Sequence, residues 1–257
     1  MLKVRNLNFS YVKHKVLNNV NFTIDEPCVV SLIGPNGSGK STLLRCLNGL
    51  LPVKNNTVFL FGKAIEKFGI KERAKLISYL PQNQERLRGI NVHELVSMGR
   101  APYNRSGWVN NEKDVKQISW SIDYMQLGTM IHRPVEKLSG GERQRAWIAM
   151  VLAQDTPIIL LDEPATYMDL KYQYELLKTL KDFKDTFNKV IIAVFHDINH
   201  AIKVSDQVYL LNEGSIYRAG ASEQVITEES VKDVYDVCVH VCDFKKCRHK
   251  VVVPAEI

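Results

Sequence analysis

Apolar and polar positions along the chain follow two different periods, and each period predicts a different kind of element. Residues 2–10 and 20–24 alternate apolar with polar positions, which is typical of half-buried antiparallel strands. Three other runs are almost continuously apolar, as central strands of a parallel sheet are when both faces are covered. These runs are Val29–Ile33, Ile158–Leu161 and Val190–Phe195.

Helices are predicted between these strands. Apolar residues recur three and four positions apart over 40–49, 142–153 and 172–187. Nearer the C-terminus, two short apolar runs flank Asn-Glu-Gly, which predicts a hairpin with its turn at Gly214. Strands that alternate with helices indicate an α/β fold built on a parallel sheet.

Residues 85–150 carry no strong strand signal and are expected to form an inserted helical lobe. Helical spacing returns at 92–98 and 112–125, on either side of a loop through 99–107. We therefore expect one domain with two lobes. The α/β core lobe comprises 1–84 and 151–257, and the helical lobe comprises 85–150.

Composition is that of a folded protein with a modest positive charge. The 257 residues are 45% hydrophobic and 24% charged, which is ample for a core and gives no sign of disorder. Lys and Arg outnumber Asp and Glu by 34 to 28, for a net charge of +6. A basic stripe interleaved with aromatic residues would indicate nucleic-acid binding, but the longest basic cluster, within 245–250, is too short. We predict no nucleic-acid partner.

The N-terminal residues argue against a secretion signal. Charged residues fall within Met1–Leu7, where such a signal needs an apolar segment. No apolar stretch approaches the roughly 18 residues that cross a bilayer. We therefore expect a cytoplasmic protein that reaches a membrane only through partners.

The cysteines are odd in number and unevenly spaced, and in a reducing compartment they are expected to be thiols. They stand at positions 28, 46, 238, 242 and 247. Cys242 and Cys247, with His240 and His249 nearby, are candidate metal ligands, but structural zinc sites show tighter spacing such as C-x-x-C. A plain terminal strand or hairpin is the favoured interpretation of this segment, and a metal there is left open.

A glycine-rich segment after the first continuous apolar run fits G-x-x-x-x-G-K-[ST] at every constrained place. Glycines let successive backbone N–H groups turn inward around an anion, and the loop opens onto a helix N-terminus that favours phosphate. Lys40 is placed to reach the β- and γ-phosphates of a nucleotide, and the Ser41 hydroxyl is placed to ligate Mg²⁺. The predicted phosphate-binding residues are Gly34, Pro35, Asn36, Gly37, Ser38, Gly39, Lys40, Ser41 and Thr42.

Two acids end the second continuous apolar run. An acid at the end of a buried strand is costly unless it meets a cation, so Asp162 is predicted to hold Mg²⁺, directly or through water. Glu163 is placed to polarise the attacking water as a general base. The alternative is that both acids are solvated at a strand end on the protein surface. The phosphate loop upstream makes this alternative much weaker than the magnesium-binding interpretation.

A second glycine-containing helix start identifies the family. Leu138 precedes Ser139-Gly140-Gly141-Glu142, just ahead of a predicted helix, an arrangement that again favours anions although it would also fit an ordinary helix cap. This segment resembles the signature sequence of ABC ATPases. The resemblance implies an α/β P-loop NTPase (RecA-like) core with a parallel sheet, an N-terminal antiparallel β subdomain and an inserted helical subdomain. It also implies that the signature residues close over ATP held by a second copy of the chain.

The resemblance supplies four further site residues. Tyr11 matches the aromatic residue that stacks on adenine, with a core aromatic as the alternative. Gln82 matches the glutamine that touches Mg²⁺ and water, although Gln84 is close enough to leave that assignment open. Asp169 matches the acid that crosses the dimer interface, and His196 matches the histidine that contacts the γ-phosphate.

Three segments narrow the resemblance to one branch. Residues 92–103, 143–150 and 166–170 resemble segments of ATP-binding subunits from type II importers of iron–siderophore, haem or cobalamin. The sequence departs only mildly from the family's pattern: Ala165 stands where the family commonly has Thr, and Met168 stands where Leu is usual. The solvent-exposed part of 85–110 is expected to receive a short permease helix, but its apolar residues would equally serve as internal packing.

The resemblance implies an ATPase of the cytoplasmic face of the cell membrane that needs ATP and Mg²⁺. The partners implied are a second identical copy, two integral-membrane permease subunits and, indirectly, a substrate-binding protein. A soluble ABC ATPase of iron–sulfur cluster assembly is the alternative, although it is not expected to carry the Gly-Arg-Ala-Pro-Tyr segment at 99–103. The transported solute stays open.

Overall fold

A computed structural model of the chain describes residues 1–84, 87–104, 111–166, 168–243 and 249–255. The chain forms two compact units, each described below by itself. Unit 1 comprises Met1–Lys67 and Leu177–Ile257, and unit 2 comprises Phe68–Leu176. The chain returns from unit 2 to unit 1 inside helix α6 (Leu170–Asp185). Cys247 and most of the basic cluster near the C-terminus lie outside the described residues.

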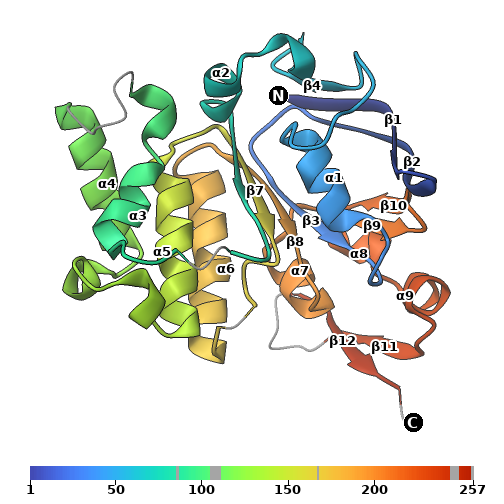
Figure 1. Cartoon of the computed structure of the whole chain (residues 1–257). Coiled ribbons are helices and arrows are strands. Elements are labelled where there is room, and N and C mark those ends of the chain that lie inside the picture. The colour runs from blue at the N-terminus through green and yellow to red at the C-terminus, as the bar shows by residue number, and fades with distance from the viewer. Residues whose placement is uncertain (85–86, 105–110, 167, 244–248, 256–257) are drawn as a thin grey trace. The chain divides into compact units, whose positions relative to one another are not determined.

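Unit 1 begins with an antiparallel sheet of strand order β2-β1-β4-β5. Its strands are β1 (Leu2–Tyr11), β2 (His14–Ile24), β4 (Val58–Leu60) and β5 (Lys63–Ala64). The long β1–β2 pair is drawn in dark blue in Figure 1. Leu2, Val4 and Leu7 are buried while their neighbours face solvent, so the alternation predicted for an N-terminal antiparallel subdomain is confirmed.

A second set of strands in unit 1 has the order β10-β9-β3-β8. The strands are β3 (Val29–Ile33), β8 (Val190–Val194), β9 (Gln207–Asn212) and β10 (Ser215–Gly220). β8 and β9 both run parallel to β3, and β10 returns antiparallel to β9. Every residue of β3 and β8 is buried, which confirms the parallel, doubly covered strands expected from their continuous apolar runs.

The predicted turns of unit 1 are present. Glu213 and Gly214 both have positive φ and link β9 to β10 as the sequence predicted. The remaining elements of this unit are α1 (Lys40–Leu47), η1 (Ile65–Lys67), α7 (Ile198–Val204), α8 (Ser222–Val225), α9 (Glu228–Tyr235), β11 (Val239–Cys242) and β12 (Val251–Pro254).

The C-terminal segment is a hairpin of β11 and β12, the favoured interpretation of the cysteine-containing tail. The Asn199 side chain of α7 holds it in place. This amide donates to the Val252 carbonyl at 3.1 Å and accepts from the Val252 N–H at 2.8 Å. Among the described residues, no group of three His, Cys, Asp or Glu side chains is placed to hold a metal ion. The described cysteines are free thiols.

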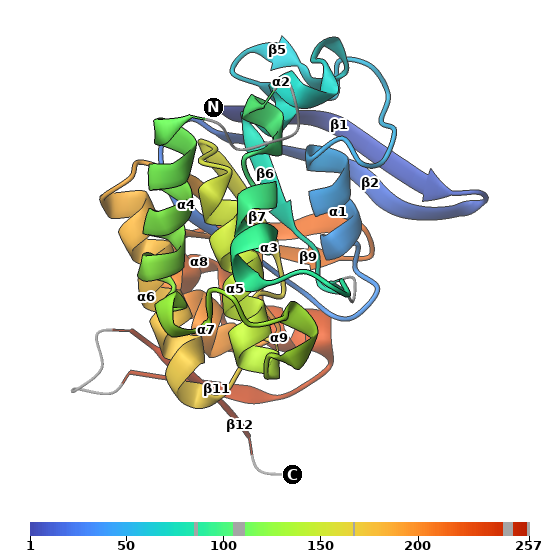
Figure 2. The same cartoon turned by 60° about the vertical axis from the view of Figure 1, so that its left-hand side comes forward.

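Unit 2 combines a parallel strand pair with helices. β6 (Ile77–Leu80) runs parallel to β7 (Ile158–Asp162). Helices α3 and α4 lie beside α5, as Figure 2 shows. The helices are α2 (Ile70–Ala74), α3 (Val92–Met98), α4 (Glu112–Tyr124) and α5 (Gly140–Ala153), with short 3₁₀ turns at η2 (Ala101–Tyr103), η3 (Gly128–Met130) and η4 (Val135–Lys137). The segment expected as a plain loop therefore contains a 3₁₀ turn, because Pro102 sits where its fixed φ suits such a turn.

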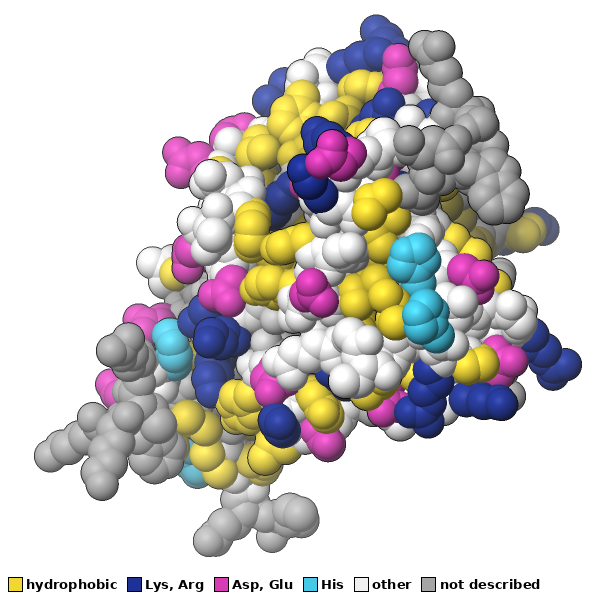
Figure 3. Space-filling view, turned by 90° about the vertical axis from the view of Figure 1, so that its left-hand side faces the viewer, with side chains coloured by type: hydrophobic (Ala, Val, Ile, Leu, Met, Phe, Trp, Pro, Cys, Tyr) yellow, Lys and Arg dark blue, Asp and Glu magenta, His cyan; other side chains and the backbone are white. Residues whose placement is uncertain are grey.

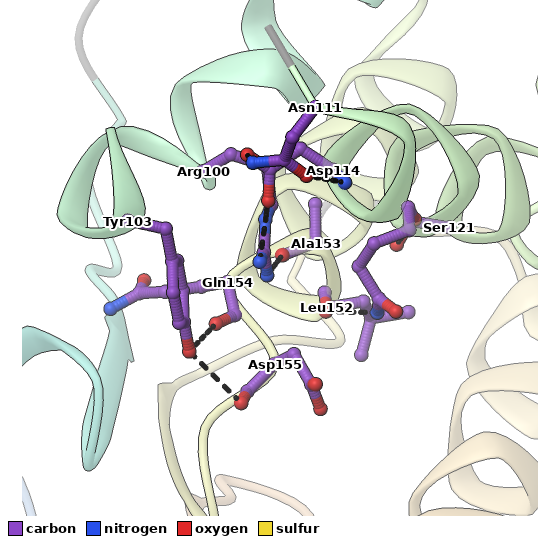
Figure 4. Close-up of polar contacts among 10 residues, drawn as sticks. Arg100, Tyr103, Asn111, Asp114, Ser121, Leu152, Ala153, Gln154 and Asp155 are labelled. Atoms are coloured by element: carbon purple, nitrogen blue, oxygen red, sulfur yellow. Dashed lines mark hydrogen bonds and ion pairs between the residues drawn. The ribbon is translucent and has the colours of Figure 1, made fainter. Parts of the chain in front are cut away.

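Buried side chains fasten the C-terminal end of α5 to the Gly-Arg-Ala-Pro-Tyr segment (Figure 4). Arg100 is 2% exposed; it pairs with buried Asp114 at 2.7 Å and donates to the Ala153 carbonyl at 2.8 Å. The guanidinium also stacks over the Tyr103 ring at 3.8 Å. The Tyr103 hydroxyl donates to the Gln154 carbonyl at 3.0 Å, and its burial raises its pKa. These donors satisfy carbonyl groups that a helix end leaves without intrahelical partners.

Surface exposure in unit 2 divides the apolar residues of the 85–110 region. Val92, Leu95 and Val96 are buried, whereas Met98 is 46% exposed. Hydrophobic side chains also reach the surface between charged ones on the face shown in Figure 3. The three buried side chains therefore serve internal packing, whereas Met98 is available at the surface. In the described part of the chain, no helix is both long and apolar enough to span a bilayer.

Candidate functional site

The glycine-rich loop connects β3 to α1 in unit 1, and its glycines are required for two separate reasons. Gly37 and Gly39 have φ of 81° and 100°, in the left-handed region that glycine adopts without strain. Packing excludes a side chain at two positions: a Cβ on Gly34 would lie 2.2 Å from the Leu211 carbonyl oxygen, and one on Gly39 would lie 2.9 Å from the Val16 carbonyl oxygen.

The interior of this loop is polar and buried. The Lys40 side chain is 6% exposed, and its ammonium donates to the carbonyls of Gly34 and Pro35, each at 2.8 Å. The Ser38 hydroxyl is buried and has no hydrogen-bond partner among the described residues. A buried hydroxyl without a partner is costly unless a ligand satisfies it. A lysine, an unsatisfied hydroxyl and the start of α1 therefore form a cradle that fits a phosphate chain.

His196 lies near this loop because of strand register. Leu32 of β3 pairs with Val194 of β8, and the Phe195 N–H donates to the Leu32 carbonyl at 3.2 Å. The two parallel strands end at the same edge, so exposed His196 and the phosphate loop leave the sheet together. The next residue, Asp197, caps α7 by accepting from the Asn199 N–H at 2.7 Å.

Tyr11 lies at the end of β1, where the β1–β2 hairpin turns. Its side chain is 42% exposed and packs edge-to-face on Phe9, with ring centroids 4.9 Å apart. It is therefore not the core aromatic considered as an alternative. An exposed aromatic ring held by a neighbouring ring is a suitable surface for a flat base.

The acids of unit 2 also follow from strand register. Leu80 of β6 pairs with Leu161 of β7, so Gln82 and Glu163 emerge at the same edge. Asp162 is fully buried, and the Tyr79 hydroxyl donates to its carboxylate at 3.2 Å. A buried carboxylate at this edge is suited to a divalent cation, since full burial of a carboxylate is costly without charge compensation.

Glu163 has an unusual backbone conformation for a non-glycine residue. Its φ is 52°, and its side chain is 9% exposed. The turn that follows closes when the Thr166 N–H donates to the Glu163 carbonyl at 3.2 Å, and the Thr166 hydroxyl donates to the Glu163 carboxylate at 3.4 Å. Such strain persists only where the surrounding structure enforces it, and it concentrates at functional sites.

The two candidate glutamines have different surroundings. Gln84 is half-buried and donates its amide to the Gln144 side chain of α5. Gln82 is exposed at the strand edge beside the acids. The amide of Gln84 is therefore engaged by the protein, whereas that of Gln82 faces solvent, where a cation or water would be met.

The signature segment forms the N-terminus of α5 with a complete capping box. The Ser139 hydroxyl accepts from the Glu142 N–H at 3.3 Å, and the Glu142 carboxylate accepts from the Ser139 N–H at 2.8 Å. This hydrogen bond from the Ser139 backbone, aided by Arg133 3.6 Å away, holds the pKa of Glu142 below its usual value. The helix continues for 14 residues, so its dipole favours an anion at this end.

Asp169 is exposed just before α6, and its carboxylate accepts from the Tyr172 N–H at 3.1 Å.

Two buried residues of α5 were assigned no role from the sequence. Arg145 is buried, donates to the Met125 carbonyl at 3.1 Å and stacks on the Tyr172 ring at 4.5 Å. Gln144 is 6% exposed; its side-chain oxygen accepts from the Gln84 amide, and its side-chain nitrogen donates to the Pro164 carbonyl. The signal available in the sequence was their place three and four residues after Gly141, within the 143–150 segment that resembles importer subunits.

A phosphate loop between a buried parallel strand and a helix, with a buried acid ending another parallel strand, defines a P-loop nucleotide-binding protein. Comparison with known proteins narrows this class: residues 17–166, more than half of the chain, match the ABC transporter family. The chain belongs to that family, and it binds and hydrolyses ATP.

Several curated relatives are similar over nearly the whole chain. The iron(3+)-hydroxamate import ATP-binding protein FhuC of Bacillus subtilis is 38% identical over 236 residues, covering 92% of this chain and 88% of the relative. The petrobactin import ATP-binding protein FpuC of Bacillus anthracis is 37% identical, covering 94% and 89%. The ferric enterobactin transport ATP-binding protein FepC of Escherichia coli is 36% identical, covering 98% and 93%.

Solved structures agree with the fold. An inward-facing ABC transporter described as metal-chelate type matches with a TM-score of 0.85 and 25% identity, covering 99% of this chain and 97% of that one. The ATP-binding cassette MJ0796, as a dimer with ADP and phosphate, matches with a TM-score of 0.77 and 27% identity, covering 86% and 99%. The predicted fold, a P-loop core with an antiparallel β subdomain and a helical subdomain, is confirmed.

Proposed function

We propose that this chain powers the import of iron–siderophore or related metal chelates. The similarity to import subunits for hydroxamate, petrobactin and enterobactin over more than nine-tenths of the chain carries this proposal. It favours import over the alternative of a soluble ATPase for iron–sulfur cluster assembly. We place the protein at the cytoplasmic face of the membrane, bound to two permease subunits and served indirectly by a substrate-binding protein.

The site is proposed to form between two copies of the chain. Each chain has two anion-favouring helix starts, the phosphate loop at α1 and the signature segment at α5. One nucleotide does not need both from the same chain. In the proposed homodimer, the signature segment of one copy grips the γ-phosphate of ATP held by the phosphate loop of the other, with Asp169 at the interface.

The proposed roles of the phosphate loop and the two acids follow from chemistry, and those of Tyr11, Gln82 and His196 follow from the resemblance to the family. Lys40 and the loop N–H groups neutralise the phosphates, Tyr11 stacks on the adenine, and His196 contacts the γ-phosphate. Ser41, Gln82 and Asp162 are the proposed ligands of Mg²⁺, which neutralises phosphate charge when bound. Glu163 orients and polarises the attacking water as general base.

Coupling to transport requires that ATP and ADP favour different states of the dimer. Driving an open–closed equilibrium from 1:99 to 99:1 takes about 5.5 kcal/mol of differential binding. Two shared triphosphates supply contacts that ADP lacks, because ADP has no γ-phosphate for the signature segment. Hydrolysis then reopens the dimer and the permease follows. The exposed apolar residue Met98 of α3 lies in the region proposed to receive the permease helix.

The substitution Glu163→Gln tests the shared site. It removes the base and keeps the shape, so we expect ATP affinity to be retained, turnover to fall at least about a hundredfold, and an ATP-bound dimer to accumulate. Size-exclusion chromatography with light scattering, at saturating ATP and Mg²⁺, measures the dimer. Glu112→Gln, the same change at an exposed carboxylate on α4, is the matched control. A Glu163→Gln protein that stays monomeric contradicts the shared site, and one that hydrolyses ATP normally contradicts the base assignment.

The solute class is tested in the assembled transporter. The chain, co-purified with its permease and reconstituted in proteoliposomes, is assayed for ATPase activity with ferric hydroxamate, ferric catecholate and cobalamin, each presented by its binding protein. Stimulation by one chelate class supports the proposal. Co-purification with a soluble scaffold complex and no permease contradicts it.

A further inference from the structure

A polar chain inside unit 2 connects three segments through one side chain. Gln144 of α5 accepts a hydrogen bond from the Gln84 amide, and its own amide donates to the Pro164 carbonyl at 2.9 Å. The Gln144 side chain is 6% exposed. The signature helix, the segment after β6 and the turn after β7 therefore meet at a single buried amide.

The Pro164 carbonyl belongs to the turn that carries Glu163. Glu163 holds a strained φ of 52°, and Pro164 has no N–H with which to join a hydrogen-bonded network. Within the turn, the Thr166 N–H and hydroxyl both donate to Glu163. The bond from Gln144 holds the same turn from a different element, so a shift of α5 along its axis pulls on the peptide next to Glu163.

We propose that Gln144 is a positioning residue that sets the conformation of the Glu163 turn according to the position of the signature helix, with Gln84 orienting its amide. This inference rests on the proposed role of Glu163 as general base. A displacement of the base by about 1 Å costs up to a hundredfold in rate, so one hydrogen bond at this turn affects hydrolysis far more than ATP binding.

Another glutamine, at the opposite end of the same helix, makes a comparable bond. The Gln154 amide donates to the Ala74 carbonyl at 2.6 Å, and among the described residues no hydrogen bond joins this amide to the Glu163 turn. If such bonds only stabilise the fold, the two glutamines are equivalent. If Gln144 positions the base, only its substitution changes turnover.

The test compares Gln144→Met with Gln154→Met in the purified full-length protein. Methionine keeps the length of the side chain and removes both hydrogen bonds. We expect Gln144→Met to lower kcat for ATP at least about tenfold while the Kd for ATP changes less than about twofold. Gln154→Met is expected to leave kcat within about twofold even if its Tm falls equally. Equal kcat values for the two variants overturn the proposal.

Two further variants separate the bonds. Gln144→Glu still accepts from Gln84 but has no donor for the Pro164 carbonyl, so it is expected to be as slow as Gln144→Met. Gln84→Met removes only the orienting contact, and combining it with Gln144→Met is expected to cause no further loss of kcat. If Gln144→Met fails to fold, Gln144→Leu, which also removes both hydrogen bonds and buries no charge, carries the same test. Normal kcat in Gln144→Glu contradicts the role of the Pro164 bond.

Failure of this inference is distinguishable from failure of the proposed function. In a Glu163→Gln background, Gln144→Met is expected to trap the ATP-bound dimer as well as Glu163→Gln alone, because binding does not depend on the turn. Loss of the trapped dimer only in the double variant indicates that Gln144 shapes the signature segment itself and overturns the positioning role. Normal hydrolysis by Glu163→Gln alone contradicts the proposed function instead.

Discussion

Two non-glycine residues with left-handed backbone differ in what enforces their conformation. Glu163 is 9% exposed, and its turn is bound by Thr166 and, through Pro164, by Gln144. Val12, at the tip of the β1–β2 hairpin, has the same φ of 52° but is 99% exposed. A β-branched residue is poorly suited to positive φ. Contacts with neighbouring residues thus enforce the strained backbone at Glu163. At Val12 the exposed side chain gains no such contacts, so the strain lowers the stability of the fold.

The strain at Val12 predicts a stabilising substitution. Val12→Asn places a residue that tolerates the left-handed region in the same turn, and we expect the free energy of unfolding to rise by about 0.5–1 kcal/mol. Urea unfolding followed by circular dichroism measures the change. Val115→Asn, at an exposed position of α4 with helical backbone, is the control and is expected to give no gain. Equal effects of the two substitutions contradict the strain argument.

At the scale of elements, α5 is held at both ends by side chains. Its N-terminus carries the Ser139–Glu142 capping box, and its C-terminal carbonyls accept from Arg100, Tyr103 and Gln117. Gly99 permits this closeness, since a Cβ there would lie 2.2 Å from the Met150 carbonyl oxygen. The segment that resembled a branch signature in the sequence thus has a direct structural role at the far end of the signature helix.

Removing one partner of the buried Arg100–Asp114 pair is expected to be costly. Arg100→Met leaves the Asp114 carboxylate buried without its cation, which lowers the free energy of unfolding by about 3–5 kcal/mol. Chemical denaturation measures the loss. Arg133→Met, at a half-exposed arginine that also donates to a carbonyl, is expected to cost less than about 1 kcal/mol. The double variant Arg100→Met/Asp114→Leu is expected to lose less than Arg100→Met alone, and a larger loss contradicts this account.

The capping box predicts a pH dependence of stability. The folded-state pKa of Glu142 is depressed by the Ser139 N–H, so its contribution is present above the unfolded pKa and is lost as pH falls through the folded value. The substitution Glu142→Gln keeps the box without a titratable group. The difference in unfolding free energy between the native chain and this variant should therefore be constant near pH 7 and decrease below the ordinary glutamate pKa of about 4.3. A pH-independent difference contradicts the assignment.

At the scale of the molecule, site residues within short segments were predictable from the sequence. The side chains that hold these segments in place from distant parts of the chain were not. The sequence predicted the phosphate loop, the acids Asp162 and Glu163, and the strands that precede them. Each of these features depends on residue types within a few positions of one another. The roles of Gln144 and Arg100 were not predicted, since their partners stand 20 and 14 residues away and the bonds depend on tertiary packing. The contact of the Gln84 amide with α5 likewise depends on tertiary packing.

The head-to-tail dimer is the largest-scale claim, and mixing two inactive variants tests it. Lys40→Ala removes the phosphate-binding ammonium and is expected to abolish ATP binding by its own loop. Ser139→Asp keeps a good helix cap but places a negative charge where the γ-phosphate of the partner's ATP is proposed to lie. Each variant alone is expected to lose nearly all ATPase activity.

In a mixed dimer, the loop of the Ser139→Asp copy faces the intact signature segment of the Lys40→Ala copy, so one complete site is restored. We therefore expect the mixture to hydrolyse ATP although neither component does, with the rate rising and then falling as the mixing ratio is varied. Thr227→Asp, the same change at the N-cap of α9, is the control and should be active alone. Two sites built within single chains would give no recovery at any ratio, because every copy in the mixture would carry a defect in its own site.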